Sequence, residues 1–405
     1  MIRIKGVMTP EGEIIDVCLE SKEDRTLEAK GLTLLPAMID PHVHFRTPGL
    51  ENKENWQSGA KAALYGGVTT VFDMPNTLPP TITLENLEAK KQLIESQLKG
   101  CGIPLHFGFY LGADKSHFNE IARCKKQVVA LKVFMGSSTG NLVMDDDSSL
   151  HAAFSLAASH DLLLAVHAED EALIEERKPL FKGRVDPKTH SELRNEEVAV
   201  RATEKAIALS KLYGTRLHLL HIGTKREIEC IASAKKEGIK VTCETTPHHL
   251  FLSIEDYARL GTKVQMNPPL RSQENVDALW QAIHNGVIDT IGSDHAPHTR
   301  EEKALPYGQA PSGIPGVETT LPLLLDACHK GRISLKQIIR LMRERIQEIY
   351  RLVPNDDFVL VDRNKKRRIE ERHLKTKCGW SPYAEKELQG WPVYTILKGK
   401  IYELN

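Results

Sequence analysis

Short apolar runs alternate with helical patterns along most of this chain, and this alternation limits the folds that it can adopt. Seven such runs lie at residues 69–72, 105–110, 128–134, 162–166, 217–220, 240–243 and 288–291, and an eighth leads into Asp40. Apolar residues have helical spacing at 84–98, 150–159, 195–212, 225–236, 275–285 and 335–350. Strands that alternate with helices in this way are typical of parallel βαβ units in α/β proteins.

Two features favour a closed barrel over an open, doubly wound sheet. There are eight strand candidates, and polar residues recur at the points where the runs end. In a (β/α)8 barrel the active site lies at the carboxyl ends of the strands, so chemistry is expected at these positions. We therefore predict a TIM-like (β/α)8 barrel over residues 38–355.

The two ends of the chain carry a different pattern. Strand-like stretches separated by turn residues lie at 2–5, 13–19 and 32–37, and others at 358–362 and 392–402. They predict a small composite β domain made from residues 1–37 and 356–405. Residues 136–149 and 297–316 are predicted to be long loops.

Composition and charge argue against several classes of protein. Lys plus Arg equals Asp plus Glu at 54 each, which gives no basic surface for nucleic acid and no polybasic membrane segment. The N-terminal residues lack the apolar core of a signal peptide, and no apolar run is long enough to span a bilayer. The seven cysteines are scattered without a CxxC pair, so we expect neither a disulfide framework nor a thiolate zinc site. These features favour a cytoplasmic protein.

The strongest local signal is an HxH pair in the segment DPHVHFR, formed by His42 and His44. Residues two apart in an extended segment point to the same side, so the pair can present two imidazoles to one metal ion. The alternative for an isolated HxH is a pair of half-buried structural histidines. Three other apolar runs also end in a polar residue: His167, His221 and Asp294. Together the five residues predict a zinc site of histidine and carboxylate ligands at the mouth of the barrel.

Lys132 lies in the middle of the apolar run VALKVFM. A buried ammonium group is costly, so this lysine either snorkels, pairs with a carboxylate or has lost its charge by chemical modification. A neutral lysine amine can add CO₂ to form a carbamate, which is an anionic oxygen ligand able to bridge two metals.

The chain resembles the amidohydrolase superfamily and, within it, the dihydroorotase family. The motifs DPHVHFRTPG, FDMPNT, LKVFM, VHAED, HIGT, TTPHHL, MNPPLR, GSDHAPHT and CGWSP occur in the order that this family shows. The resemblance spans residues 36–394 and is far more specific than any single motif.

The resemblance implies one or two zinc ions. His42, His44 and Asp294 would hold one zinc, and N6-carboxylated Lys132 would bridge it to a second zinc held by His167 and His221. The TDDG motif that supplies an aspartate in many related enzymes is absent after Lys132. That departure favours the carbamate, although an aspartate at 145, 146 or 147 remains an alternative ligand.

The implied reaction interconverts N-carbamoyl-L-aspartate and (S)-dihydroorotate, a step of pyrimidine (UMP) biosynthesis. Zinc lowers the pKa of a bound water to about 7 and polarises a carbonyl, which amide hydrolysis requires. Asp294 would act as general base and acid, moving a proton between that water and the leaving nitrogen. We expect small-molecule substrates and no nucleic-acid or membrane partner; a homodimer is compatible with the sequence.

The substrate carboxylate requires a cationic or amide partner. Arg46 lies two residues beyond His44 on the same side of the segment and offers a bidentate guanidinium. The resemblance implies that Arg46, Asn76 and His298 bind this carboxylate and that His44 also contacts the substrate. It also implies that Asn267 and the backbone of Ser312 and Gly313 contact the ring amides; Ser312 replaces the phenylalanine that is frequent there.

Two other functions are compatible with the same metal-ligand pattern or the same fold. An allantoinase or hydantoinase would share the metal ligands, but its neutral ring substrates would have no carboxylate for Arg46. A non-catalytic barrel relative would usually have lost metal ligands, and here all of them are present. His248, His249 and His295 are interpreted as supporting or structural residues.

Overall fold

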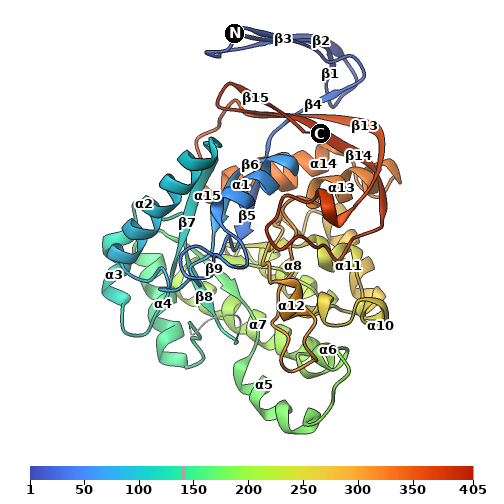
Figure 1. Cartoon of the computed structure of the whole chain (residues 1–405). Helices are drawn as coiled ribbons and strands as arrows, with labels where there is room; N and C mark the ends of the chain where they lie inside the picture. The colour runs from blue at the N-terminus through green and yellow to red at the C-terminus, as the bar shows by residue number, and fades with distance from the viewer. Residues whose placement is uncertain (138–141, 405) are drawn as a thin grey trace.

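Eight parallel strands follow one another in chain order in a single sheet of the computed structural model, which describes residues 1–137 and 142–404 (Figure 1). The strands are β5 (Met38–Val43), β6 (Val68–Asp73), β7 (His106–Gly112), β8 (Ala130–Phe134), β9 (Leu163–His167), β10 (Arg216–Leu219), β11 (Val241–Thr245) and β12 (Thr290–Ile291). Each of the eight predicted runs contributes one of them.

Contacts between β5 and the segment after β12 bring the two edges of this sheet together. Val43 forms a parallel bridge with His295, and the backbone N–H of His44 donates to the carbonyl of His295 at 2.8 Å. The backbone N–H of Ser293 donates to a carboxylate oxygen of Asp40 at 3.0 Å. The predicted TIM-like (β/α)8 barrel is therefore confirmed.

Helices lie between the strands and cover the outside of the barrel (Figure 1). They are α1 (Trp56–Tyr65), α2 (Leu84–Cys101), α3 (Phe118–Cys124), α4 (Asp147–Ser159), α5 (Glu171–Arg177), α6 (Thr189–Leu193), α7 (Glu196–Tyr213), α8 (Lys225–Lys236), α9 (Pro247–Phe251), α10 (Tyr257–Leu260), α11 (Gln273–His284), α12 (Arg300–Lys303), α13 (Thr320–His329), α14 (Leu335–Ile339) and α15 (Arg345–Tyr350). Capping residues in the local sequence determine where these helices begin and end. In α2, the hydroxyl of Thr83 accepts the Asn86 N–H at the start, and Gly102 ends the helix with a φ of 68°.

Burial on both sides explains why the barrel strands read as continuous apolar runs. Every residue of β5, β6, β8 and β9 is buried, because the outer side packs under helices and the inner side fills the barrel. The polar residues that end these strands are consequently buried as well.

A second sheet joins the two ends of the chain. It contains β1 (Ile2–Met8), β2 (Ile14–Leu19), β3 (Arg25–Glu28), β4 (Thr33–Pro36), β13 (Phe358–Arg368), β14 (Glu387–Leu397) and β15 (Lys400–Glu403). The antiparallel pairing of β4 with β13 connects the N-terminal strands to the C-terminal ones, which lie together at the top of Figure 1. The predicted domain limits of 1–37 with 356–405, and 38–355, remain a prediction.

The two predicted loops are only partly irregular. Residues 297–316 contain the single turn of α12, and α4 begins at Asp147 within the predicted loop 136–149, of which residues 138–141 lie outside the described part of the chain. Among the described residues, no helix combines the length and apolar character needed to cross a membrane.

Candidate metal and substrate site

One pocket at the carboxyl ends of the barrel strands brings the predicted site residues together. It is lined by His42, His44, Arg46, Asn76, Lys132, Phe134, His167, His221, Met266, Asn267, Asp294, Ala296, Ser312 and Gly313. His298, predicted to bind the substrate carboxylate, does not line the pocket, but its Nε2 lies 3.2 Å from Nη2 of Arg46, which does. Strand ends that are far apart in the sequence thus converge, as expected for this fold.

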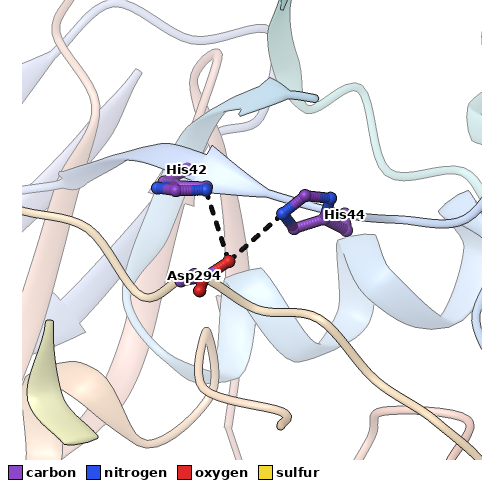
Figure 2. Close-up of side chains that lie close together, drawn as sticks. All are labelled: His42, His44 and Asp294. Atoms are coloured by element: carbon purple, nitrogen blue, oxygen red, sulfur yellow. Dashed lines mark hydrogen bonds and ion pairs between the residues drawn. The ribbon is translucent and has the colours of Figure 1, made fainter. Parts of the chain in front are cut away.

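His42, His44 and Asp294 form a tight, buried cluster (Figure 2). The Oδ1 atom of Asp294 lies 3.3 Å from Nε2 of His42 and 3.1 Å from Nε2 of His44. Their candidate ligand atoms all lie within 4.8 Å of one another. The HxH spacing places both imidazoles on one side of β5, with ring centroids 5.4 Å apart, as predicted.

The second ring nitrogen of each histidine is held by another side chain. Nδ1 of His42 lies 2.7 Å from Oε1 of Glu244, and Nδ1 of His44 lies 2.8 Å from Oδ1 of Asn76. Both partner oxygens can accept from an Nδ1–H group, and in that tautomer the Nε2 lone pairs face Asp294, as metal binding through Nε2 requires. Burial lowers the pKa of His42 and His44 to about 4, which keeps both rings neutral.

This arrangement fits a cation. With the ring protons on Nδ1, two imidazole lone pairs and a carboxylate oxygen would converge on one point, and a positive ion between them would remove their mutual repulsion. Histidine nitrogens and a carboxylate oxygen are a ligand set that zinc accepts. The geometry therefore supports a metal at His42, His44 and Asp294.

A second pair of imidazoles lies beside the first. Nδ1 of His167 is 3.0 Å from Nε2 of His221, and the ring of His221 is 5.5 Å from that of His42. Nε2 of His167 lies 3.0 Å from Glu169, which leaves the lone pair of Nδ1 facing His221. Burial opposes ionisation of Glu169, but Arg194 outweighs it and holds the pKa of Glu169 at about 2.

Lys132 is only 1% exposed and lines the same pocket. Its ammonium group lies 4.5 Å from the centroid of the Phe134 ring and has no hydrogen bond or salt bridge to any described residue. Burial lowers the pKa of Lys132 to about 7, although Asp294 and Glu244 act in the opposite direction. A fraction of the neutral amine is therefore present near neutral pH, and carbamate formation requires this form.

The alternative aspartate ligands occupy the surface. Asp145 and Asp146 pair with Lys115 at 2.9 and 2.7 Å, and Asp147 pairs with Lys205. None of the three aspartates lines the pocket. Their positions give no support to a role as bridging ligands.

Arg46 is a buried cation, 2% exposed, with no carboxylate partner among the described residues. Its Nε donates to the carbonyl of Pro297 at 3.1 Å, and its Nη2 lies 3.2 Å from Nε2 of His298. Burial lowers the pKa of Arg46 to about 10, so the guanidinium remains charged at neutral pH. An unpaired buried charge at a pocket wall is the expected form of an anion-binding site.

Residues 266–267 and 312–313 line another part of the pocket. Oδ1 of Asn267 accepts from Nε2 of His190 at 2.7 Å, and the N–H of Gly313 donates to the carbonyl of Gln265 at 2.9 Å. Gly313 has a φ of 138°, and a Cβ there would meet the carbonyl oxygen of Ala296 at 2.5 Å. Only glycine fits this position without a shift.

Three site residues have strained backbones. Arg46, His221 and Asp294 have φ angles of 65°, 40° and 45°. Non-glycine residues rarely adopt positive φ, and such strain is concentrated at functional sites.

Sequence reasoning missed the acidic partners of the histidines. Glu244 and Glu169 are fully buried, and each contacts a ring nitrogen of a candidate ligand. A signal for Glu244 existed, because the run at 240–243 also leads into a polar strand end. His248, His249 and His295 do not line the pocket, and their supporting role stays a prediction. His295 accepts the Gly316 N–H at 3.0 Å.

The sequence model described as "Amidohydrolase family" matches residues 33–346. A protein named dihydroorotase from Halobacterium salinarum is 35% identical over 420 residues, covering 98% of this chain and 95% of that protein. Another protein of that name, from Methanosarcina acetivorans, is 36% identical over 398 residues, covering 94% of this chain and 84% of its own.

Among solved structures, the chain is similar to an L-hydantoinase (dihydropyrimidinase) from Arthrobacter aurescens. The TM-score is 0.91 at 27% identity, and the match covers 99% of this chain and 95% of the other. A dihydropyrimidinase from Brevibacillus agri gives 0.87 at 27% identity, covering 98% and 94%.

Proposed function

Since this chain belongs to the amidohydrolase family, we propose that it is a dihydroorotase that reversibly cyclises N-carbamoyl-L-aspartate to (S)-dihydroorotate in pyrimidine (UMP) biosynthesis. Similarity over nearly the whole chain to two proteins of that name supports the proposal. The observation that carries it is the buried guanidinium of Arg46, which has no carboxylate partner within the described part of the chain and lies beside the cluster of His42, His44 and Asp294.

The carboxylate of dihydroorotate supplies the missing partner of Arg46. In this proposal, Arg46, His298 and Asn76 bind it, and its charge neutralises a cation that is otherwise costly to bury. Asn267 and the backbone at Ser312 and Gly313 contact the ring amides from the opposite wall. These contacts would fix the scissile amide of the ring over Asp294.

The histidine and carboxylate set would hold one or two zinc ions. His42, His44 and Asp294 form one ligand group, and His167, His221 and carboxylated Lys132 complete the other. Bound zinc supplies an activated water and polarises the amide carbonyl.

Asp294 transfers the proton from the attacking water to the leaving ring nitrogen. The pKa of Asp294 lies well below its usual range, because the nearby His42 and His44 outweigh the effect of burial, so the carboxylate is ionised at neutral pH. In ring opening it accepts a proton as the water oxygen bonds to the amide carbon. It then delivers that proton to the ring nitrogen as the carbon–nitrogen bond breaks. Cyclisation follows the same steps in reverse.

A hydantoinase is the second candidate, because the similar solved structures carry that name. Hydantoin, allantoin and dihydrouracil have cyclic amides but no carboxylate. If one of them were the substrate, the charge of Arg46 would remain buried without a partner.

The test is to assay the zinc-loaded protein in parallel on dihydroorotate, dihydrouracil, hydantoin and allantoin. Dihydrouracil is the matched control, since it is dihydroorotate without the carboxylate. We expect kcat/KM for dihydroorotate to exceed that for dihydrouracil by about 100-fold or more. Turnover of hydantoin or dihydrouracil without turnover of dihydroorotate would refute the proposal. Zinc clearly below one ion per chain, with no activity after added zinc, would instead indicate a non-catalytic barrel.

A further inference from the structure

Each ring nitrogen of His298 faces one donor and one acceptor. Nε2 lies 3.0 Å from the carbonyl oxygen of Ser312, which only accepts, and 3.2 Å from Nη2 of Arg46, which only donates. Nδ1 lies 3.1 Å from Nζ of Lys53, which only donates, and 3.6 Å from Oε2 of Glu302, which only accepts. The surroundings thus permit two tautomers, and the groups around Nδ1 decide between them.

We propose that Lys53 is a positioning residue that holds His298 in the tautomer with its proton on Nε2, where that proton faces an anion beside Arg46. The proposal rests on the proposed function, because the anion is the carboxylate of the substrate. An ammonium group has no lone pair, so a hydrogen bond from Lys53 requires the unprotonated form of Nδ1. Lys53 also pairs with Oε1 of Glu302 at 2.9 Å, and this contact satisfies the carboxylate that would otherwise take a proton from Nδ1.

The tautomer determines whether an anion can bind. With the proton on Nε2, His298 donates to the Ser312 carbonyl at 3.0 Å, and Nη2 of Arg46 lies 3.2 Å from the same nitrogen. A carboxylate oxygen placed between the two nitrogens could accept from both in place of that carbonyl. With the proton on Nδ1, the Nε2 lone pair would accept from Arg46 and repel the carboxylate. The ring carries one proton at neutral pH, because burial, followed by Arg46 and Lys53, keeps the pKa of His298 well below its ordinary value.

Lys53 is suited to this role by its position. Its side chain is 12% exposed, it does not line the pocket, and it approaches His298 on the side away from Arg46. Lys53 therefore acts on the substrate only through His298.

The first test compares Lys53→Met with Lys53→Arg in the zinc-loaded protein. Methionine keeps the length of the side chain but removes the donor, so we expect KM for dihydroorotate to rise about tenfold or more, with kcat changed much less. Arginine keeps a donor and should recover most of the loss. The matched control is Lys211→Met, which removes an exposed lysine paired with Glu237 and should leave both constants unchanged.

A double variant makes the test sharper. In Lys53→Met the carboxylate of Glu302 keeps the Thr299 N–H but loses its ammonium partner, and its charge then favours the wrong tautomer. Adding Glu302→Gln removes that charge and keeps an oxygen for the Thr299 N–H, so it should lower KM again. An equal or larger KM in the double variant would contradict the proposal, because simple loss of packing predicts additive damage.

The tautomer can also be read without substrate. Nitrogen–proton correlation spectra of the zinc-loaded, ¹⁵N-histidine-labelled protein report which ring nitrogen is protonated, and the His298 signals are assigned by their loss in His298→Gln. We expect protonated Nε2 in the parent protein and protonated Nδ1 in Lys53→Met. Protonated Nδ1 in the parent protein, or no change in the variant, would overturn the proposal. This measurement needs no turnover, so a failure of the proposed function would be distinguishable.

Discussion

Nδ1 of His42 lies 2.7 Å from Oε1 of Glu244, and both side chains are buried within the barrel. The contact joins strand ends that are 202 residues apart in the chain. When His42 donates its Nδ1 proton to this carboxyl group, the Nε2 lone pair faces the pocket and can bind a metal.

Replacing the carboxyl group of Glu244 should weaken metal binding. Burial raises the pKa of this group well above its ordinary value, and a bound cation would favour the carboxylate that polarises His42. Glu244→Gln cannot form that carboxylate, so the ring becomes a weaker ligand and we expect zinc affinity to fall about 10- to 100-fold. Competition with a chromogenic chelator measures this change. Glu237→Gln, at an exposed glutamate, is the control; an unchanged affinity in Glu244→Gln would show that Glu244 does not support the ligand.

Replacing Lys132 tests the carbamate. Lys132→Ala removes the candidate bridging group, so we expect activity to be lost and then partly restored by short carboxylic acids that replace the carbamate oxygens. Activity and zinc content are measured with and without added acetate or propionate. Absence of rescue together with unchanged zinc content would count against carboxylation.

Replacing Arg46 tests the carboxylate site. Arg46→Ala removes the buried cation, so KM for dihydroorotate should rise about 30-fold or more while the zinc content stays the same. Arg46→Lys keeps the charge but loses the bidentate geometry, so its KM for dihydroorotate should lie between those of the parent protein and Arg46→Ala. A KM equal to that of the parent protein would remove Arg46 from the substrate site.

Buried histidines should make the metal-free protein less stable in mild acid. Burial lowers the pKa of His190 and His248 to about 4 from an ordinary value of 6.5. Between these values the unfolded chain takes up protons that the folded chain does not, so the free energy of unfolding falls as the pH decreases from about 6.5 toward 4. Thermal denaturation followed by circular dichroism measures this trend.

The variant His248→Leu removes one of these groups and should make that pH dependence shallower. Stability that is flat from pH 6.5 to 5 in the parent protein would contradict the assignment of neutral, buried imidazoles.

The barrel could be predicted because strands that are buried on both sides appear in the sequence as continuous apolar runs. The convergence of the candidate ligands could be predicted because a polar residue at the end of such a run lies at the mouth of the barrel. His167 and His221 were found from this signal, and so was Asp294. The HxH spacing needed only the two-residue repeat of an extended chain.

Other features depend on contacts between distant segments, and local sequence does not encode them. β3 (Arg25–Glu28) has only one buried residue and exists because it pairs with β1, so its sequence carries little strand signal. The contact of Lys53 with His298 spans 245 residues. Similarly, local sequence does not show whether Arg46 has a carboxylate partner, and none of the residues at 1–137 and 142–404 supplies one.

The most direct test of this account is a crystal structure of the zinc-loaded protein with dihydroorotate bound. We predict zinc bound by His42, His44 and Asp294, and the carboxylate of the substrate within hydrogen-bond distance of Arg46 and His298. A substrate carboxylate that points away from Arg46, or zinc bound elsewhere than at this cluster, would contradict the account.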